Sequence, residues 1–257
     1  MSSRALSFGS VAQAYERFRP GYPDELVGLV SSYAGRPITS ALEIGAGTGK
    51  ATRLFAAHGV AVTATEPDAA MLAELRRHVP ETVRTVQSSF EQLDELDAET
   101  YDLVFAAASV HWTEPEGRWS RVAAMLHADG VFASFGGPVR LADRAVEEAV
   151  RSARAPYLES DDIASPDGTP PESTLQWPGT ELERSGLLTD VQQRVVERRL
   201  TMSAAAYVGY LSTVSAYLEL PPPTRSEVLG AIQEVLPPEV KVDADVVVHL
   251  ARRSAGR

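Results

Sequence analysis

The sequence predicts an α/β fold built on a mostly parallel sheet, and three observations lead to this expectation. Strand-like and helix-like stretches alternate between residues 39 and 135, which is typical of consecutive βα units. A glycine-rich run at 45–49 follows the first strand-like stretch directly. The apolar content of 44% and charged content of 23% are ordinary for a globular chain. A sheet covered by helices on both faces is therefore expected.

The first half of the chain supplies the strands of this sheet. Gly59 is expected to cap the first helix after the glycine run, and Asp68 to open the next one. Thr113 and Glu116 have the spacing of a capping box and predict a third helix start. The turn at 128–130 separates that helix from the strand that follows. The strands are expected at 39–44, 60–65, 82–87, 101–106 and 131–135.

The regular alternation of strand-like and helix-like stretches ends after Gly136. The polar stretch 158–178 carries four prolines, and because structureless loops of this length are usually functional lids or disordered, we expect a lid that is mobile until the acceptor binds. The proline run 221–223 is expected to stop a helix. Helices are expected over 142–157, 207–218 and 228–236, and strands over 191–200 and 240–250. We expect an N-terminal segment 1–36, a cofactor-binding core 37–137, and a cap with the last two strands over 138–257.

Composition narrows the classes of partner. The net charge of −11 disfavours nucleic acids and anionic membranes, which repel an acidic surface. No apolar stretch has the length of about 20 residues that a bilayer span needs. The N-terminus lacks the apolar core of a signal peptide, so the cytoplasm is the expected location. Cysteines are absent, which excludes disulfides and thiolate metal sites, and no metal site is expected.

The glycine run predicts a nucleotide-type cofactor. Glycines at 45, 47 and 49 let the backbone turn sharply and approach a ligand, and a strand-to-helix loop of such a sheet faces the ligand crevice. Glu43 precedes the run, and Glu66 ends the second strand, where a carboxylate can bind two ribose hydroxyls. A nicotinamide dinucleotide is the alternative, but its folds usually show G-x-G-x-x-G, whereas these glycines alternate.

These motifs resemble the class I S-adenosylmethionine-dependent methyltransferases. Within that family the chain is most similar to the small-molecule group that includes trans-aconitate methyltransferase-like proteins. The resemblance is strongest from Phe8 to Phe135 and rests on the stretches 42–49, 65–68, 88–91 and 107–112. It implies a Rossmann-like sheet of seven strands with the last antiparallel, a small helical cap, and S-adenosyl-L-methionine as cofactor, with S-adenosyl-L-homocysteine as product.

The resemblance also implies individual cofactor contacts. Gly45 and Gly47 would border the methionine part, Glu66 the ribose, and Met71 the adenine. Relatives often have an aspartate here that forms a hydrogen bond with the adenine amino group. This sequence has Ser89 at that position, so the backbone of Phe90 would form the contact instead. The implied set of cofactor-binding residues is Tyr15, Arg19, Glu43, Gly45, Ala46, Gly47, Glu66, Pro67, Met71, Ser89, Phe90 and Ala107.

The N-terminal run 15–23 carries two residues of that set. In relatives, the tyrosine and the arginine before proline approach the cofactor carboxylate. Arg19 suits that role because its guanidinium can pair with a carboxylate through two hydrogen bonds. The alternative is that Val11, Tyr15 and Phe18 form an ordinary apolar helix face.

The acceptor side is expected just past the fourth strand. His111 is the candidate catalytic base, because its pKa lies near neutrality; the alternative is a structural histidine that bonds to the backbone beside Trp112. The other histidines, at 58, 78, 127 and 249, are interpreted as surface or core residues. The residues expected to bind the acceptor are Tyr22, His111, Trp112, Trp177, Tyr207 and Tyr210.

The sequence therefore predicts a methyltransferase that acts on a hydroxyl or carboxylate oxygen of a small molecule, such as a natural-product intermediate. The alternatives are a cofactor-binding relative that catalyses a non-methylating reaction such as cyclisation, and a nicotinamide-dependent oxidoreductase. A nucleic-acid methyltransferase is disfavoured, because the fourth strand ends in Ala107-Ala108-Ser109-Val110 rather than an Asn/Asp-Pro-Pro-Tyr turn. A monomer or a homodimer is expected.

Overall fold

The computed structural model describes residues 7–95, 100–161, 165–170 and 172–254. Its main sheet has seven strands in the order β3-β2-β1-β4-β5-β10-β7. The expected seven-stranded, mostly parallel sheet is confirmed: β10 alone runs antiparallel to both of its neighbours. The strands are β1 (Ser40–Ile44), β2 (Ala61–Thr65), β3 (Arg84–Val86), β4 (Tyr101–Ala107), β5 (Leu126–Gly136), β7 (Leu188–Val196) and β10 (Val246–Arg253).

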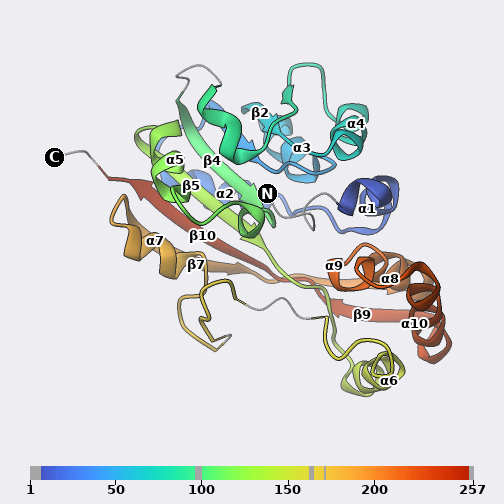
Figure 1. The fold of residues 1–257 in the computed structure, drawn as a ribbon. Helices are drawn as coiled ribbons and strands as arrows, with labels where there is room; N and C mark the ends of the chain where they lie inside the picture. Colours follow the sequence, from blue (N-terminus) through green and yellow to red (C-terminus); the bar gives the residue numbers. More distant parts are fainter. Residues whose placement is uncertain (1–6, 96–99, 162–164, 171, 255–257) are drawn as a thin grey trace.

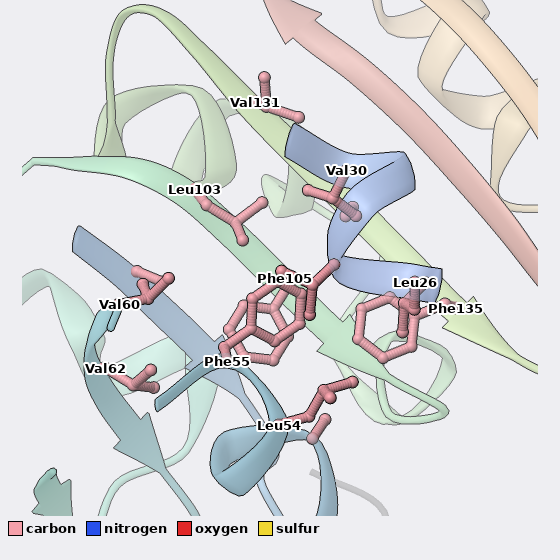
Figure 2. Close-up of a cluster of buried hydrophobic side chains, with 14 of the residues drawn as sticks. Leu26, Val30, Leu54, Phe55, Val60, Val62, Leu103, Phe105, Val131 and Phe135 are labelled. Atoms are coloured by element: carbon pink, nitrogen blue, oxygen red, sulfur yellow. The ribbon is translucent and has the colours of Figure 1, made fainter. Parts of the chain in front are cut away.

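Helices cover both faces of this sheet. On one face, α2 (Glu25–Ala34) and α3 (Lys50–Ala57) pack Leu26 and Phe55 against Phe105 of β4, as Figure 2 shows. On the other face lie α5 (Arg118–Met125) and α7 (Gly179–Ser185). The apolar contacts on the two faces bury the central strands β1, β2 and β4 almost completely, which explains their nearly continuous apolar sequences, whereas the edge strands β3 and β7 are partly exposed.

The N-terminal residues lie at the edge where the cofactor is expected. After a 3-10 turn, η1 (Ser7–Val11), the helix α1 (Ala12–Phe18) packs against α4 (Ala69–His78) and the cap. As expected, Asp68 opens α4: its Oδ1 accepts hydrogen bonds from the amides of Ala70 and Met71. Two further 3-10 turns, η2 (Phe90–Glu95) and η3 (Val110–Trp112), follow β3 and β4.

The cap is not purely helical, so that expectation is wrong in part. It contains a second, three-stranded sheet in the order β6-β9-β8, formed by β6 (Arg140–Leu141), β8 (Arg199–Ser203) and β9 (Glu239–Asp243). Helices cover this small sheet and enclose a separate apolar core. They are α6 (Arg144–Arg154), α8 (Ala204–Leu211), α9 (Ser215–Leu218) and α10 (Pro222–Val235).

The two expected late strands, 191–200 and 240–250, are each two strands that belong to different sheets. The breaks face each other: the Arg198 amide donates to Asp245 Oδ1 at 2.8 Å, and the Ala244 amide donates to the Arg198 carbonyl at 2.7 Å. Figure 1 shows the resulting arm, in which β7 and β10 of the main sheet lead toward β9 among the cap helices. The second sheet of the cap therefore follows on from two strands of the main sheet.

Several expected element ends are also wrong. No capping box forms at Thr113: α5 begins after Gly117, which has φ +73°, and the Thr113 hydroxyl donates to the Val110 carbonyl. The expected helix 207–218 is divided by a tight turn at Thr213, whose amide donates to the Tyr210 carbonyl. The proline run begins α10 rather than stopping a helix, since proline suits a first helical turn.

The turn expected at 128–130 lies within β5, where Asp129 has φ +61° and the pairing with β4 shifts register. Residues 162–164 and 171 of the expected lid lie outside the described part of the chain. In that described part, no helix has the length and apolar character needed to cross a membrane.

Candidate active site

A cavity of about 650 Å³ lies between the main sheet and the cap, at the carboxyl ends of the parallel strands where such sheets bind ligands. It runs from the glycine loop and Glu66 at one end to His111 and Trp177 at the other. A hollow of about 80 Å³ adjoins it and shares Gly45, Tyr15 and Arg19 as lining residues. The size is in the range of small-molecule sites.

The glycine loop is folded tightly against the end of β4. Gly45 and Gly47 have φ values of +64° and +59°, which strain any residue with a side chain. A Cβ on Gly45 would lie 2.8 Å from the Cβ of Ser109, and the Ser109 hydroxyl donates to the Ile44 carbonyl. The Ala46 amide donates to the Thr65 carbonyl at 2.8 Å. The backbone of the loop therefore borders the cavity directly.

Glu66 lies beside this loop at the end of β2. Its Oε2 accepts from the Gly47 amide at 2.8 Å and its Oε1 from the Asp68 amide at 2.9 Å. Burial raises the pKa of the Glu66 carboxyl to about 7, against the lowering effect of the two amide donors. Both oxygens are thus oriented by backbone, and the side chain, 6% exposed, lines the cavity.

Glu43 is fully buried in β1 and lines the small hollow. Its Oε2 accepts from the Thr52 hydroxyl at 2.5 Å, whereas its Oε1 has no hydrogen-bond partner. Burial raises the pKa of this carboxyl to about 8. A buried oxygen without a hydrogen-bond partner is costly, and a cationic amino group in the hollow would supply a donor and favour the ionised form of the carboxyl. This orphaned oxygen fits the amino-acid end of S-adenosylmethionine.

Arg19 and Tyr15 lie at the same end. The guanidinium of Arg19 stacks between the rings of Tyr15 and Tyr210, 5.0 Å and 4.9 Å from their centroids. Its Nε donates to Thr213 Oγ1 and its Nη2 to the Thr213 carbonyl, both at 2.9 Å. Arg19 is therefore held by the cap, and it lines both hollows together with Tyr15 and Tyr210.

The remaining expected cofactor residues fall into two groups. Pro67, Met71 and Phe90 line the large cavity near Glu66, and Ala107 lines both hollows. Ser89 lines neither: its hydroxyl donates to Gln92 Oε1 at 3.2 Å inside the turn before η2. The structure thus places the expected adenine contacts on apolar side chains and leaves the Ser89 hydroxyl elsewhere.

At the acceptor end, the 3-10 turn after β4 brings His111 and Trp112 into the cavity. The His111 ring lies 4.4 Å from the Trp112 ring and 6.5 Å from the Trp177 ring, measured between centroids. Two tyrosines expected here lie elsewhere. Tyr22 packs edge-on against Phe135 and lines only the small hollow. Tyr207 is buried in the core of the cap, outside both hollows.

Three residues that sequence reasoning did not select are important here. Ala108 has φ +54°, an unusual value for a residue with a side chain, and it lines both hollows where β4 ends. His249, interpreted as a surface or core residue, is buried in β10 but also lines the large cavity. Arg118 is buried behind Trp177. A positive φ and tertiary contacts leave no local signal in a sequence.

Within the described residues, no group of histidines and carboxylates could hold a metal ion. The arrangement is instead a backbone cradle with one oriented carboxylate, joined to an aromatic chamber. Together with the strand order, these features are those of the class I methyltransferase architecture.

Comparisons with known proteins agree with this class. The family described as "Methyltransferase domain" matches residues 42–134. An uncharacterized methyltransferase of Mycobacterium tuberculosis (strain H37Rv) is 30% identical over 232 residues, which cover 90% of this chain and 86% of that protein. A probable S-adenosylmethionine-dependent methyltransferase of Saccharomyces cerevisiae is 31% identical over 124 residues, which cover 46% of this chain and 43% of that protein.

The fold is also found among solved structures. A putative type II methyltransferase from Anaeromyxobacter dehalogenans superposes with a TM-score of 0.63 at 22% identity, covering 91% of this chain and 98% of that one. The chain belongs to the class I S-adenosylmethionine-dependent methyltransferase family. It is a methyltransferase whose cofactor is S-adenosylmethionine and whose cofactor product is S-adenosylhomocysteine.

Proposed function

We propose that the protein transfers the methyl group to a hydroxyl oxygen of a small-molecule acceptor, with His111 as the base. The observation that carries this proposal is the position of His111. It lines the same cavity as Gly45, Glu66 and Ala107. It follows the carboxyl end of β4, next to the expected position of the methyl donor. The volume of the cavity, about 650 Å³, supports a small acceptor rather than a macromolecule.

The cofactor is proposed to lie along the glycine loop. Glu66 would bind the ribose hydroxyls, the apolar side chains of Pro67, Met71 and Phe90 would pack on the adenine, and Glu43 would face the amino group. Arg19 would pair with the carboxylate, for which its stacked position between Tyr15 and Tyr210 prepares it. Gly45, Ala46, Gly47 and Ala107 would border the methionine chain.

S-adenosylmethionine supplies a methyl group that its sulfonium charge already activates. The contribution of the protein is then position and removal of one proton. A ring nitrogen of His111 would accept the hydroxyl proton as the oxygen attacks. Trp112 and Trp177 would exclude water from that oxygen, because their rings enclose the His111 side of the cavity.

The N-terminal segment 1–36 is proposed to close the core 37–137 over the cofactor, with the cap 138–257 on the acceptor side. A direct contact supports this arrangement. The Phe18 ring packs on Gly209 of α8 so closely that a Cβ there would lie 2.6 Å from it. Because Arg19 follows Phe18 and bonds to Thr213, closure over the cofactor and over the acceptor would be coupled.

The experiment that tests the proposal is His111→Ala, assayed with methyl-labelled S-adenosylmethionine on a panel of phenols, alcohols and carboxylic acids. A general base contributes about a hundred- to ten-thousand-fold to the rate, so methylation of hydroxyls should fall by that factor while cofactor affinity is unchanged. The wild-type rate should also fall as His111 becomes protonated. His58→Ala, at the exposed end of α3, is the matched control.

A carboxylate acceptor is the alternative, because a carboxylate is already deprotonated and needs no base. Labelled esters formed at equal rates by wild type and His111→Ala would favour that alternative and overturn the role of His111.

A further inference from the structure

The ring of Trp177 has an unusual position for a residue of a surface loop. It precedes α7, lines the acceptor end of the large cavity, and faces His111 at 6.5 Å. Of the three tryptophans in the chain, Trp112 and Trp177 line this cavity, whereas Trp119 packs against Phe132 under α5. The acceptor chamber therefore carries two indole rings around the candidate base.

On its outer side, Trp177 is supported by Arg118. That guanidinium is 2% exposed and lies 5.5 Å from the Trp177 ring centroid. Arg118 is itself fixed by Thr113, which accepts through its hydroxyl and carbonyl at 2.7 Å and 2.6 Å, and by Glu181 Oε2 at 2.9 Å. A side chain held by this many partners forms a rigid backing for the indole.

Gln176, the residue before Trp177, is hydrogen-bonded to the main sheet. The Gln176 amide donates to Gln193 Oε1 at 2.8 Å, and the same oxygen lies 2.9 Å from His249 Nε2. Gln193 and His249 are direct partners on β7 and β10. Burial lowers the pKa of His249 to about 4, so this imidazole is neutral at physiological pH. The ring of Trp177 is thus fixed before an acceptor arrives.

The charged residues of the described cavity lining, histidines aside, are few. Arg19 and Glu66 belong to the cofactor end, while Arg140 and Asp161 are contributed by the cap. Asp161 pairs with Arg154 and accepts a hydrogen bond from Tyr217. A polycarboxylate would need several converging cations to replace its hydration, and this lining does not converge them. Its other members include Pro138, Pro166, Pro170, Pro178, Val214 and Val247.

We infer that the acceptor is an uncharged, flat aromatic molecule that lies against the indole of Trp177, with its reacting oxygen on the edge that faces His111. Trp177 is then the residue that determines acceptor specificity, and Arg118 and Gln193 are its positioning residues. The inference rests on the proposed function, since it specifies the acceptor of that same site. It separates this chain from methyltransferases of tricarboxylates, whose acceptor carries several charges.

The test is calorimetric titration of the protein saturated with S-adenosylhomocysteine. Four probes are compared: 2-naphthol, its saturated counterpart decahydro-2-naphthol, 2-naphthoate and trans-aconitate. Contact between aromatic rings adds about 0.5–1.5 kcal/mol to area burial, so 2-naphthol should bind about two- to tenfold tighter than the saturated alcohol. We expect Trp177→Ala to abolish this preference and Trp177→Phe to retain most of it.

The matched control is Tyr33→Ala, because Tyr33 also stacks on an arginine, Arg252 at 5.2 Å, but lies outside the cavity lining. The inference is overturned if wild type shows no preference for the flat alcohol, if the preference survives Trp177→Ala, or if 2-naphthoate or trans-aconitate binds more tightly than 2-naphthol. Its failure is distinct from that of the proposed function, which is decided by the labelled products and not by these affinities.

Discussion

The two ends of the cavity are built in different ways. The cofactor end consists mainly of backbone: a glycine loop, the ends of β1, β2 and β4, and two amides that orient Glu66. The acceptor end consists of side chains from separate segments, with His111 after β4, Trp177 before α7 and His249 on β10. One end is specified by local geometry, and the other by packing between distant parts of the chain.

This difference has a functional consequence. The glycine loop and the strand ends at the cofactor end do not depend on the side chains of the acceptor end, whereas the acceptor chamber changes with each substitution of a side chain that lines it. Such a fold can therefore serve many acceptors without losing its cofactor. Apart from the contact of Arg19 with Thr213 of the cap, the two ends should therefore respond independently to mutation.

The largest expected effect is at the acceptor end. Arg118→Met removes the cation from a buried pair in which Glu181 is only 24% exposed and leaves the Thr113 carbonyl without its donor. We expect a loss of about 3 kcal/mol in the free energy of unfolding, measured by urea denaturation, with affinity for S-adenosylhomocysteine unchanged within twofold. Arg144→Met, at the exposed start of α6, is the control. Equal losses of stability and cofactor affinity would contradict the independence of the two ends.

The complementary change is Glu66→Ala. A carboxylate that bonds to two hydroxyls contributes about 1.5–3 kcal/mol, so calorimetry should show affinity for S-adenosylhomocysteine reduced by about ten- to a hundredfold. Binding of 2-naphthol to the variant should remain, because the acceptor end is untouched. Glu81→Ala, exposed before β3, should bind like wild type. Undiminished affinity in a folded Glu66→Ala protein would remove this residue from the site.

The pH dependence of stability sharpens the comparison further. Burial raises the pKa of Glu43 to about 8 from the ordinary 4.5, so the folded protein holds a proton that the unfolded chain has released. Stability from this group is therefore present at low pH and is lost as pH rises through 8. Between pH 6.5 and 8.5 we expect the contribution of Glu43 to fall by on the order of 2 kcal/mol. Glu66, whose pKa burial raises to about 7, adds a smaller fall that wild type and a Glu43 variant share.

Glu43→Gln provides the reference for that measurement, because an amide keeps the shape and cannot ionise. Urea denaturation of wild type and Glu43→Gln should give curves that diverge as pH rises from 6.5, with the variant the more stable at pH 8.5. Parallel curves would show that Glu43 is already ionised in the folded protein. His249, whose pKa burial lowers to about 4, is neutral throughout this range and does not contribute.

The same contrast explains what could be predicted from sequence. Gly45, Glu66 and Asp68 were predicted in their structural places because a turn, a strand end and a helix cap are local features with residue preferences of their own. The strands 191–200 and 240–250 were joined incorrectly, because neither stretch contains a glycine or proline and the apolar alternation of 240–250 continues across its break. Only the contacts of Arg198 with Ala244 and Asp245 reveal that break.

The tyrosines of α8 show why the residues of the acceptor end could be predicted only in part. Tyr207 and Tyr210 have helical spacing, and both were expected at the acceptor, yet only Tyr210 reaches the cavity while Tyr207 packs in the cap. Which face of a helix meets a cavity depends on how that helix docks, and the strand crossing that orients the cap was not visible in the pattern. His249 was missed for a related reason, since a lone polar residue in an apolar strand has no local signature.

The smallest expected effect lies where the cap contacts Arg19 at the cofactor end. Thr213→Val removes the hydroxyl that accepts from Arg19 Nε at 2.9 Å, while the carbonyl contact and the stacking between Tyr15 and Tyr210 remain. A hydrogen bond from a charged donor contributes about 1.5–3 kcal/mol to stability, but because the other contacts of Arg19 remain, only part of it reaches the cofactor, and affinity for S-adenosylhomocysteine should fall about two- to fivefold. Ser212→Ala is the matched control, because that neighbouring hydroxyl donates to the Gly209 carbonyl and does not touch Arg19. A loss in Thr213→Val alone would mean that a cap residue assists cofactor binding through Arg19, so the ends are coupled at this one point. Identical affinities in both variants and wild type would mean that Arg19 is a packing residue, as its apolar helix neighbours are, and that the cofactor carboxylate is bound elsewhere.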